Sequence, residues 1–176
     1  MLGILQNLIT GYYAFFIAGA TLLADRFLKT VIAEKILIGE KIIILKDILS
    51  ITNISNTGAA FGIFQDKVAF LALFSIIITV CITVYLWKSY KTLDLITNIS
   101  WGLILGGTIG NFIDRLCFGY VVDFISIDFV SFPVFNVADM CINIGAVLLI
   151  YKLIVNNKTN DASKVKAYEH VNYGKR

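Results

Sequence analysis

The feature that most constrains this sequence is Val68–Trp87, a run of 20 residues without a single charged side chain. As an α-helix this run would be about 30 Å long, which matches the hydrocarbon core of a bilayer. The rest of the chain has the same character, because 58% of the 176 residues are hydrophobic and only 15% are charged. Soluble domains are about 45–50% apolar and about 25% charged. The sequence therefore predicts a membrane protein, and it excludes an ordinary soluble globular domain and a disordered chain.

Three further segments have the length and apolar character of membrane spans. The first has no basic residues ahead of its apolar part, so we expect a retained helix rather than a cleaved signal. We predict an all-α membrane protein with one four-helix domain (residues 1–155) and a polar cytoplasmic tail (residues 156–176). The predicted transmembrane helices lie at residues 12–31, 68–87, 95–113 and 135–155.

The distribution of basic residues predicts an orientation. Lys88 and Lys91 lie in the short connection between the second and third spans, and further Lys and Arg residues lie in the tail. By the positive-inside rule, both termini and this connection are cytoplasmic, and the other two connections are extracytoplasmic. The net charge of +3 is too small to indicate a nucleic-acid partner.

The two outer connections have more structure than plain loops. Ile42–Leu45 and Ile48–Ile54 are short, rich in β-branched residues and bounded by polar ones, so we predict a small extracytoplasmic β-sheet on the membrane surface. Val121–Val134 is apolar with acids at intervals, which indicates an interfacial segment, either a strand or a short amphipathic helix.

Metal and serine-hydrolase chemistry have little support in the sequence. The three cysteines, Cys81, Cys117 and Cys141, form no CxxC motif, and the only histidine, His170, lies in the tail. We therefore predict no metal site and no cofactor.

Polar side chains collect at the outer ends of the predicted helices. An ionisable group within a membrane costs about 2.5–3.5 kcal/mol on insertion scales, so each one needs a reason. Asn136, Asp139 and Asn143 occur at i, i+3 and i+7, on one stripe of the fourth helix. The other polar residues at this end are Asp25, Lys29, Asn56, Asn111, Asp114 and Arg115. Glycines that allow close approach of a neighbouring helix lie at Gly102, Gly106 and Gly110. The sequence predicts a polar pocket between the helices, open to the outer surface.

Carboxylates are the strongest candidates for chemistry in this pocket. Two neighbouring carboxylates cannot both ionise, so the pair keeps one proton near neutral pH. The ionised group can take a proton from water while the protonated group donates to a carbonyl oxygen, as in aspartyl peptidases. Three acids, Asp114, Asp123 and Asp139, are available, and spacing alone does not choose between them.

Five motifs in order along the chain resemble the lipoprotein signal peptidase (signal peptidase II) family. The resemblance extends from about Tyr12 to Val155, and each motif alone would be weak. The motifs are Asp25–Lys29 (DRFLK), Asn56–Gly62 (NTGAAFG), Asn111–Arg115 (NFIDR), Gly119–Phe124 (GYVVDF) and Phe135–Asp139 (FNVAD).

The resemblance implies an aspartyl endopeptidase of the bacterial cytoplasmic (inner) membrane, with its active site at the extracytoplasmic face. Its substrates would be prolipoproteins, cleaved just before a diacylglyceryl-modified cysteine, and we expect it to act as a monomer in the lipid bilayer. Asp123 and Asp139 would be the catalytic pair. Supporting residues would be Asn111, Arg115 and Asn136 around the pair, Asn56 at the substrate or surface loop, and Asp25 and Lys29 at the first helix.

Two other functions fit the sequence less well. A proton-coupled transporter using Asp114 and Asp139 would place its charges near the midplane, and a non-enzymatic scaffold would leave Asp139 unexplained. For individual residues, we expect Asp114 to pair with Arg115, Asp25 to pair with Lys29, and Asn143 to form a hydrogen bond between helices.

Overall fold

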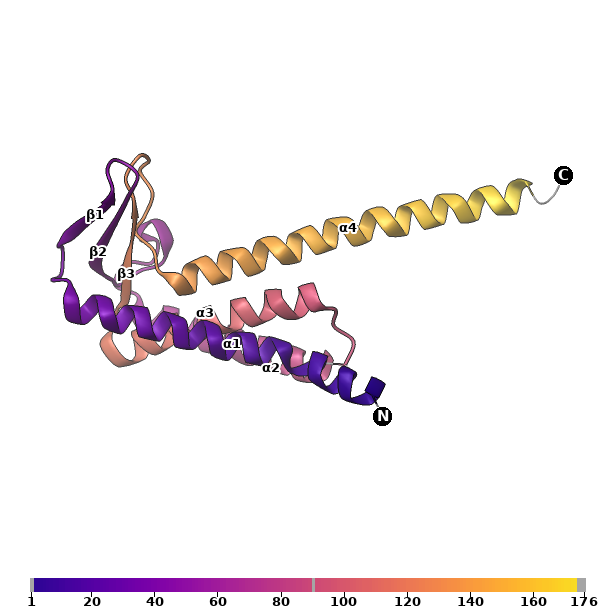
Figure 1. Ribbon diagram of the computed structural model, residues 1–176, viewed down its shortest axis with the longest axis horizontal. Helices are drawn as coiled ribbons and strands as arrows, with labels where there is room; N and C mark the ends of the chain where they lie inside the picture. The colour runs from indigo at the N-terminus through magenta and orange to yellow at the C-terminus, as the bar shows by residue number, and fades with distance from the viewer. Residues whose placement is uncertain (1, 90, 174–176) are drawn as a thin grey trace.

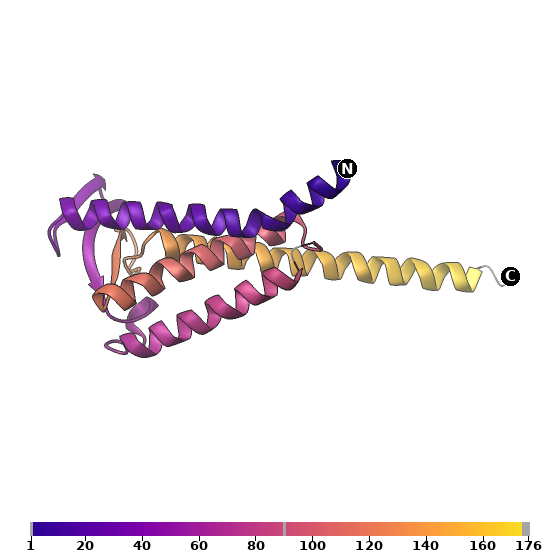
Figure 2. The same ribbon diagram turned by 90° about the horizontal axis from the view of Figure 1, so that it is seen from below.

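The computed structural model describes the backbone of residues 2–89 and 91–173, and the side chains of residues 12–59, 61–89 and 91–156. Helix α3 packs against α1, α2 and α4, and a small sheet lies across one end of this bundle (Figures 1 and 2). The helices are α1 (Leu2–Lys35), α2 (Val68–Ser89), α3 (Leu95–Phe118) and α4 (Val137–Tyr173), with a short 3-10 turn η1 (Ala60–Gly62) before α2. The strands are β1 (Lys41–Leu45), β2 (Leu49–Asn56) and β3 (Val121–Ile127).

The helices agree with the four predicted segments in position but are longer. Helix α1 extends beyond both ends of its predicted span, α3 continues past residue 113 to Phe118, and α4 continues to Tyr173, into the predicted tail. The side chains of the tail, including His170, lie outside the described residues. Within the described residues, α2 and the part of α4 from Val137 to Asn156 are long and apolar enough to cross a membrane. The four-span topology therefore stays a prediction.

The outer connections form one antiparallel sheet in the order β1-β2-β3. The predicted pair of strands is confirmed, and the third outer segment adopts the strand rather than the amphipathic helix. Its partner decides this, because β3 pairs with β2 so that Asn56 lies opposite Val121 and Ile54 lies opposite Asp123. Val122 and Phe124 pack on Ile32 and Ile36, which fixes the sheet to the end of α1.

Glycines allow α3 to approach two neighbouring helices closely. A Cβ atom on Gly106 would lie 2.5 Å from the Ala18 carbonyl oxygen of α1, and one on Gly107 would lie 2.5 Å from the Ala138 carbonyl oxygen of α4. The predicted close approach at Gly102, Gly106 and Gly110 is confirmed, because all three face α1. Backbones this close leave room for short polar contacts between the helices.

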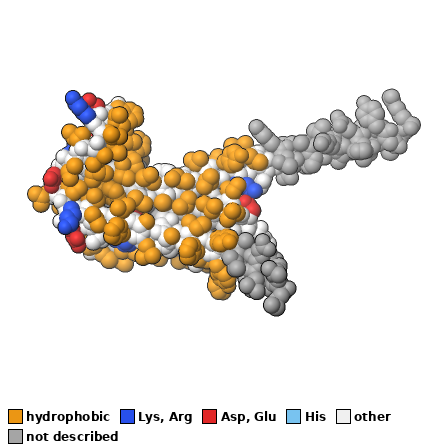
Figure 3. Space-filling model, in the orientation of Figure 1, with side chains coloured by type: hydrophobic (Ala, Val, Ile, Leu, Met, Phe, Trp, Pro, Cys, Tyr) orange, Lys and Arg blue, Asp and Glu red, His pale blue; other side chains and the backbone are white. Residues whose placement is uncertain are grey.

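The outer surface of the bundle is apolar. Phe16, Leu73 and Val147 are more than half exposed, although side chains of this kind are normally buried in soluble proteins. Figure 3 shows hydrophobic side chains over most of the helical surface, with charged groups mainly near its two ends. This distribution is typical of a protein whose helices are in contact with lipid.

Candidate active site

Asp123 reaches the interior because of the alternation of strand β3. Val122 and Phe124 face α1, so Val121 and Asp123 project from the opposite face of the strand. Both residues line a cavity of about 510 Å³, and Asp123 is only 2% exposed. A carboxyl group in this position is withdrawn from bulk water and aimed at the space that a substrate can enter.

Asp139 is held by the start of helix α4. Asn136 caps this helix, since its side-chain oxygen accepts a hydrogen bond from the Asp139 backbone N–H at 2.9 Å. In return, Asp139 Oδ2 accepts one from the Asn136 backbone N–H at 3.2 Å. This reciprocal arrangement is a capping box, here built from Asn and Asp. The same contacts that begin α4 therefore fix the direction of the Asp139 carboxylate.

Three amide side chains hold the two carboxylates, and one of them, Asn136, contacts both. Asn136 Nδ2 donates to Asp123 Oδ1 at 2.7 Å, so one residue contacts both acids. Asn111 Nδ2 donates to Asp139 Oδ1 at 2.7 Å, and Asn56 Nδ2 donates to Asp123 Oδ2 at 2.8 Å. Asn56, Asn111, Asn136 and both acids thus come together as the resemblance implied, although they come from β2, α3, β3, α4 and the residue that caps α4.

Burial raises the pKa of Asp123 to about 7, and the negative charge of Asp139 adds to this rise. The hydrogen bonds from Asn56 and Asn136 lower the pKa and oppose part of the effect. Asp123 therefore titrates near neutral pH, which is the condition for one proton to be held within the pair.

Arg115 forms its hydrogen bonds at the rim of the cavity and does not pair with Asp114. Its Nη2 donates to the Gly58 carbonyl oxygen at 3.1 Å, and its Nη1 donates to the Asn111 carbonyl oxygen at 3.4 Å. Gly58 belongs to the turn after β2, where its own N–H donates to Asn56 Oδ1. The prediction that Arg115 pairs with Asp114 is wrong, because Asp114 faces α1 on the other side of the helix.

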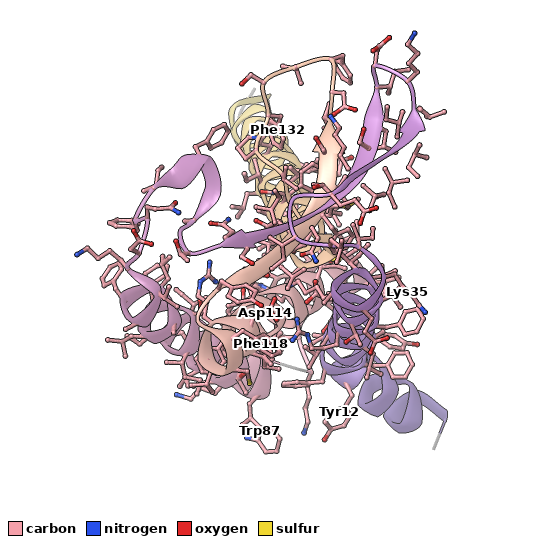
Figure 4. All side chains as sticks on the ribbon, turned by 90° about the vertical axis from the view of Figure 1, so that its left-hand side faces the viewer. Tyr12, Lys35, Trp87, Asp114, Phe118 and Phe132 are labelled. Atoms are coloured by element: carbon pink, nitrogen blue, oxygen red, sulfur yellow. The ribbon has the colours of Figure 1, made fainter. Side chains whose placement is uncertain are left out.

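A buried ion cluster lies behind the two carboxylates, between α1 and α3, where Figure 4 labels Asp114. Lys29 Nζ lies 2.9 Å from Asp25 Oδ2 and 2.8 Å from Asp114 Oδ2, so the predicted Asp25–Lys29 pair is confirmed. Arg26 forms a second ion pair with Asp114. Two acids and two bases make the cluster neutral, which is the arrangement that buried charges require.

The ion cluster is joined directly to the residues that hold the two carboxylates. Lys29 Nζ donates to Asn111 Oδ1 at 2.8 Å, and Asn111 in turn holds Asp139. Asp25 Oδ1 accepts from the Ala138 N–H at 3.0 Å, which ties the start of α4 to α1. Asp25 and Lys29 therefore support the site rather than line it. Arg26 was missed as part of this cluster, although its position beside Asp25 made it a candidate.

The cavity wall combines these polar groups with a larger apolar surface. Phe132 and Phe135 make an edge contact, with ring centres 5.7 Å apart, and Phe61 packs edge-on against Phe132 at 5.8 Å. Met140 and Ile144 of α4 continue the wall away from the sheet. A second hollow of about 260 Å³ adjoins Asn56 and Asp123 on the side of Gln65. Asp123 thus lies between the two open spaces, whereas Asp139 lines only the larger one.

Asn143 lines the same cavity as Asp139. The prediction that it forms a hydrogen bond between helices is wrong, because its side chain is exposed and makes no such bond with the described residues. Within the described residues, no group of three or more His, Cys, Asp or Glu side chains is arranged to hold a metal ion.

Known proteins are similar to this chain in sequence and in fold. A protein from Halothermothrix orenii named lipoprotein signal peptidase is 43% identical over 141 residues, which cover 80% of this chain and 94% of that protein. A lipoprotein signal peptidase from Clostridium tetani is 40% identical over 143 residues, covering 80% and 91%. A solved bacterial membrane enzyme superposes with a TM-score of 0.77 at 33% identity, covering 83% of this chain and 90% of that one. The family described as Signal peptidase (SPase) II matches residues 17–155, and the chain therefore belongs to this family of peptidases.

Proposed function

We propose that this protein removes signal peptides from diacylglyceryl-modified prolipoproteins by cleaving just before the lipidated cysteine, with Asp123 and Asp139 as its catalytic pair. The observation that carries the proposal is the pair of carboxylates bridged by Asn136 at the wall of one cavity. The names of the relatives support the substrate class.

Asp139 acts as the base and Asp123 as the acid in this mechanism. The pKa of Asp123 near 7 favours its protonated form when Asp139 is ionised. Asp139 takes a proton from the attacking water while the water oxygen bonds to the scissile carbonyl carbon. Asp123 gives its proton to the carbonyl oxygen. When the C–N bond breaks, Asp139 returns its proton to the amine, and Asp123 regains one from the hydroxyl.

The supporting residues keep this geometry without taking part in proton transfer. Asn111 and Asn136 hold the carboxylates, Arg115 fixes the Gly58 turn, and Asn56 joins that turn to Asp123. Lys29 and Asp25 brace Asn111 and the start of α4. Holding reacting groups in place before substrate arrives is the main contribution that such residues make to rate.

All four helices cross the membrane in this proposal, with both termini cytoplasmic and the sheet at the extracytoplasmic face. Helices α1 and α3 are less apolar than α2, but Asp25, Lys29 and Asp114 face one another rather than lipid. Charges that are paired inside a bundle are compatible with a membrane span. The apolar side chains of Met140 and Ile144 then form a surface along which a lipidated substrate reaches the acids from the bilayer.

The proposal is tested with purified protein in detergent micelles and a diacylglyceryl-modified prolipoprotein. Cleavage is expected immediately before the lipidated cysteine, and Asp123→Asn and Asp139→Asn are each expected to lower kcat at least about 10²-fold. Asp47→Asn is the matched control, because this acid lies in the exposed β1–β2 turn with φ of 59°, a conformation that Asn also tolerates.

Mass spectrometry of both products locates the cleaved bond. Full cleavage by either active-site variant would overturn the assignment of the catalytic pair, while cleavage at another bond would overturn the substrate assignment. Activity is also expected to persist in EDTA, since the proton transfers need no metal.

A further inference from the structure

One polar side chain in the cavity wall has no partner among the residues that the structure describes. The other polar lining residues, Asn56, Asn111, Arg115, Asp123 and Asp139, each make at least one hydrogen bond. Asn143 lines the same cavity with an exposed side chain and makes none with any residue that the structure describes. Its amide is therefore available to a molecule that enters the cavity.

The position of Asn143 makes an amide without a hydrogen-bond partner energetically unfavourable. It lies one helical turn after Asp139, about 6 Å further along α4, away from the sheet. Its neighbours in the wall are Met140, Ile142 and Ile144, which offer no hydrogen-bonding groups. A polar group in apolar surroundings is unfavourable unless it finds a partner, so the substrate is the natural source of one.

A signal peptide has unpaired carbonyl groups at this depth. A peptide crossing the bilayer is helical, because only internal hydrogen bonds satisfy its backbone there. Its chain must leave the helix before the scissile bond, since water and two carboxylates have to reach that bond. The last four carbonyl oxygens of a helix have no partner within it. The two N–H groups of an Asn amide are suitable donors to them.

We propose that Asn143 is a substrate-binding residue, which donates hydrogen bonds to the backbone carbonyls where the signal helix ends before the cleavage site. The inference rests on the proposed function and refines it by naming what part of the substrate lies below the carboxylates. The direction of α4 fits, because Asn143 lies on the bilayer side of Asp139 and the signal helix approaches from that side.

Substrate binding and turnover are compared for Asn143→Leu, which keeps the branching at Cγ and removes the amide, and for Asn143→Thr, which keeps one donor. We expect Asn143→Leu to raise KM about 3- to 20-fold with kcat little changed, the range of one hydrogen bond in a membrane protein. Asn143→Thr is expected to recover part of the loss. Val147→Leu is the matched control, because Val147 lies one turn further along α4, exposed and outside the cavity.

Two further measurements separate this role from other ones. In an Asp139→Asn background, Asn143→Leu is expected to weaken binding of the uncleaved substrate by the same factor. A substrate whose lipid is ether-linked has no ester carbonyls, and the effect of Asn143→Leu is expected to persist with it.

An unchanged KM in Asn143→Leu would overturn the inference while leaving the proposed function intact, provided that the unaltered protein cleaves. Loss of the effect with the ether-linked substrate would overturn it as well, by assigning the amide to the lipid. A fall in kcat with the same KM would show a role in holding Asp139. Absence of cleavage by the unaltered protein would overturn the proposed function and the inference together.

Discussion

At the scale of single residues, the site depends on the pKa of one carboxyl group, that of Asp123. Asp123 has a raised pKa because it is buried and lies near the charge of Asp139, and two amide donors oppose the rise. The balance leaves Asp123 protonated below about pH 7 and ionised above it. A mechanism that needs its proton must therefore lose rate as the pH rises through this value.

We expect kcat/KM to fall on the alkaline side with a midpoint near pH 7, and Asn56→Leu to move this limb to higher pH. Asn56 lowers the pKa of Asp123 by donating to its ionised form, so losing the donor makes the carboxyl harder to ionise. The pH profile of cleavage gives the midpoint of the alkaline limb for the unaltered protein and for Asn56→Leu. An alkaline limb that stays in place in Asn56→Leu would contradict the assignment of Asp123 as the acid.

At the scale of elements, the site depends on how closely α3 approaches α1. Gly106 faces the Ala18 carbonyl oxygen and the Thr21 side chain, and the ion cluster lies further along the same pair of helices. Lys29 of α1 reaches Asp114 and Asn111 of α3 only while the two backbones stay at this distance. Packing of small residues thus sets the position of a polar group that contacts the active site.

Gly106→Ala is expected to lower stability by about 1–3 kcal/mol, because the new methyl would lie 2.5 Å from a backbone oxygen. Gly19→Ala is the matched control, since a Cβ there meets nothing within 4 Å and Ala favours a helix by up to about 1 kcal/mol. Thermal unfolding in micelles compares the two variants. Equal melting temperatures would show that the α1–α3 contact tolerates separation and does not fix the cluster.

Local sequence patterns predicted the secondary structure of single segments better than they predicted which segments pack or pair together. The run Val68–Trp87 and the β-branched segments around β1 and β2 specify their own secondary structure, and the glycine spacing indicated the close helix contact. The choice between strand and helix for β3 depends on pairing with β2, which no local pattern contains.

Spacing along the chain also did not identify the two acids that we propose as catalytic. Asp114 and Asp123 are both buried at the same end of the molecule, and only the contacts of Asp114 with Arg26 and Lys29 distinguish a structural acid from a candidate catalyst. Adjacency to Arg115 suggested the wrong partner for Asp114, because a neighbour in sequence on a helix need not share its face. The resemblance to a family selected Asp123 where the residue pattern left three acids open.

At the scale of the whole molecule, the polar and apolar surfaces divide along the length of the bundle. The sheet and the two acids that we propose as catalytic, Asp123 of β3 and Asp139 of α4, lie at one end, and the connection between α2 and α3 lies at the other (Figures 1 and 2). Lys88 and Lys91 belong to that second end, so the positive-inside rule assigns it to the cytoplasm. The cavity would then open at the extracytoplasmic face.

Cysteine accessibility in cells tests this orientation. In a background with Cys81, Cys117 and Cys141 replaced by Ala, Lys46→Cys marks the β1–β2 turn and Lys88→Cys marks the end of α2. Both side chains are exposed, so a membrane-impermeant maleimide reaches each one wherever its side of the membrane is open to the reagent. We expect Lys46→Cys to react in cells with an intact inner membrane and Lys88→Cys to react only after that membrane is permeabilised. The opposite pattern would place the cavity on the cytoplasmic side. Reaction of both variants without permeabilisation would put the two ends of α2 on the same side and so would contradict a membrane-spanning α2.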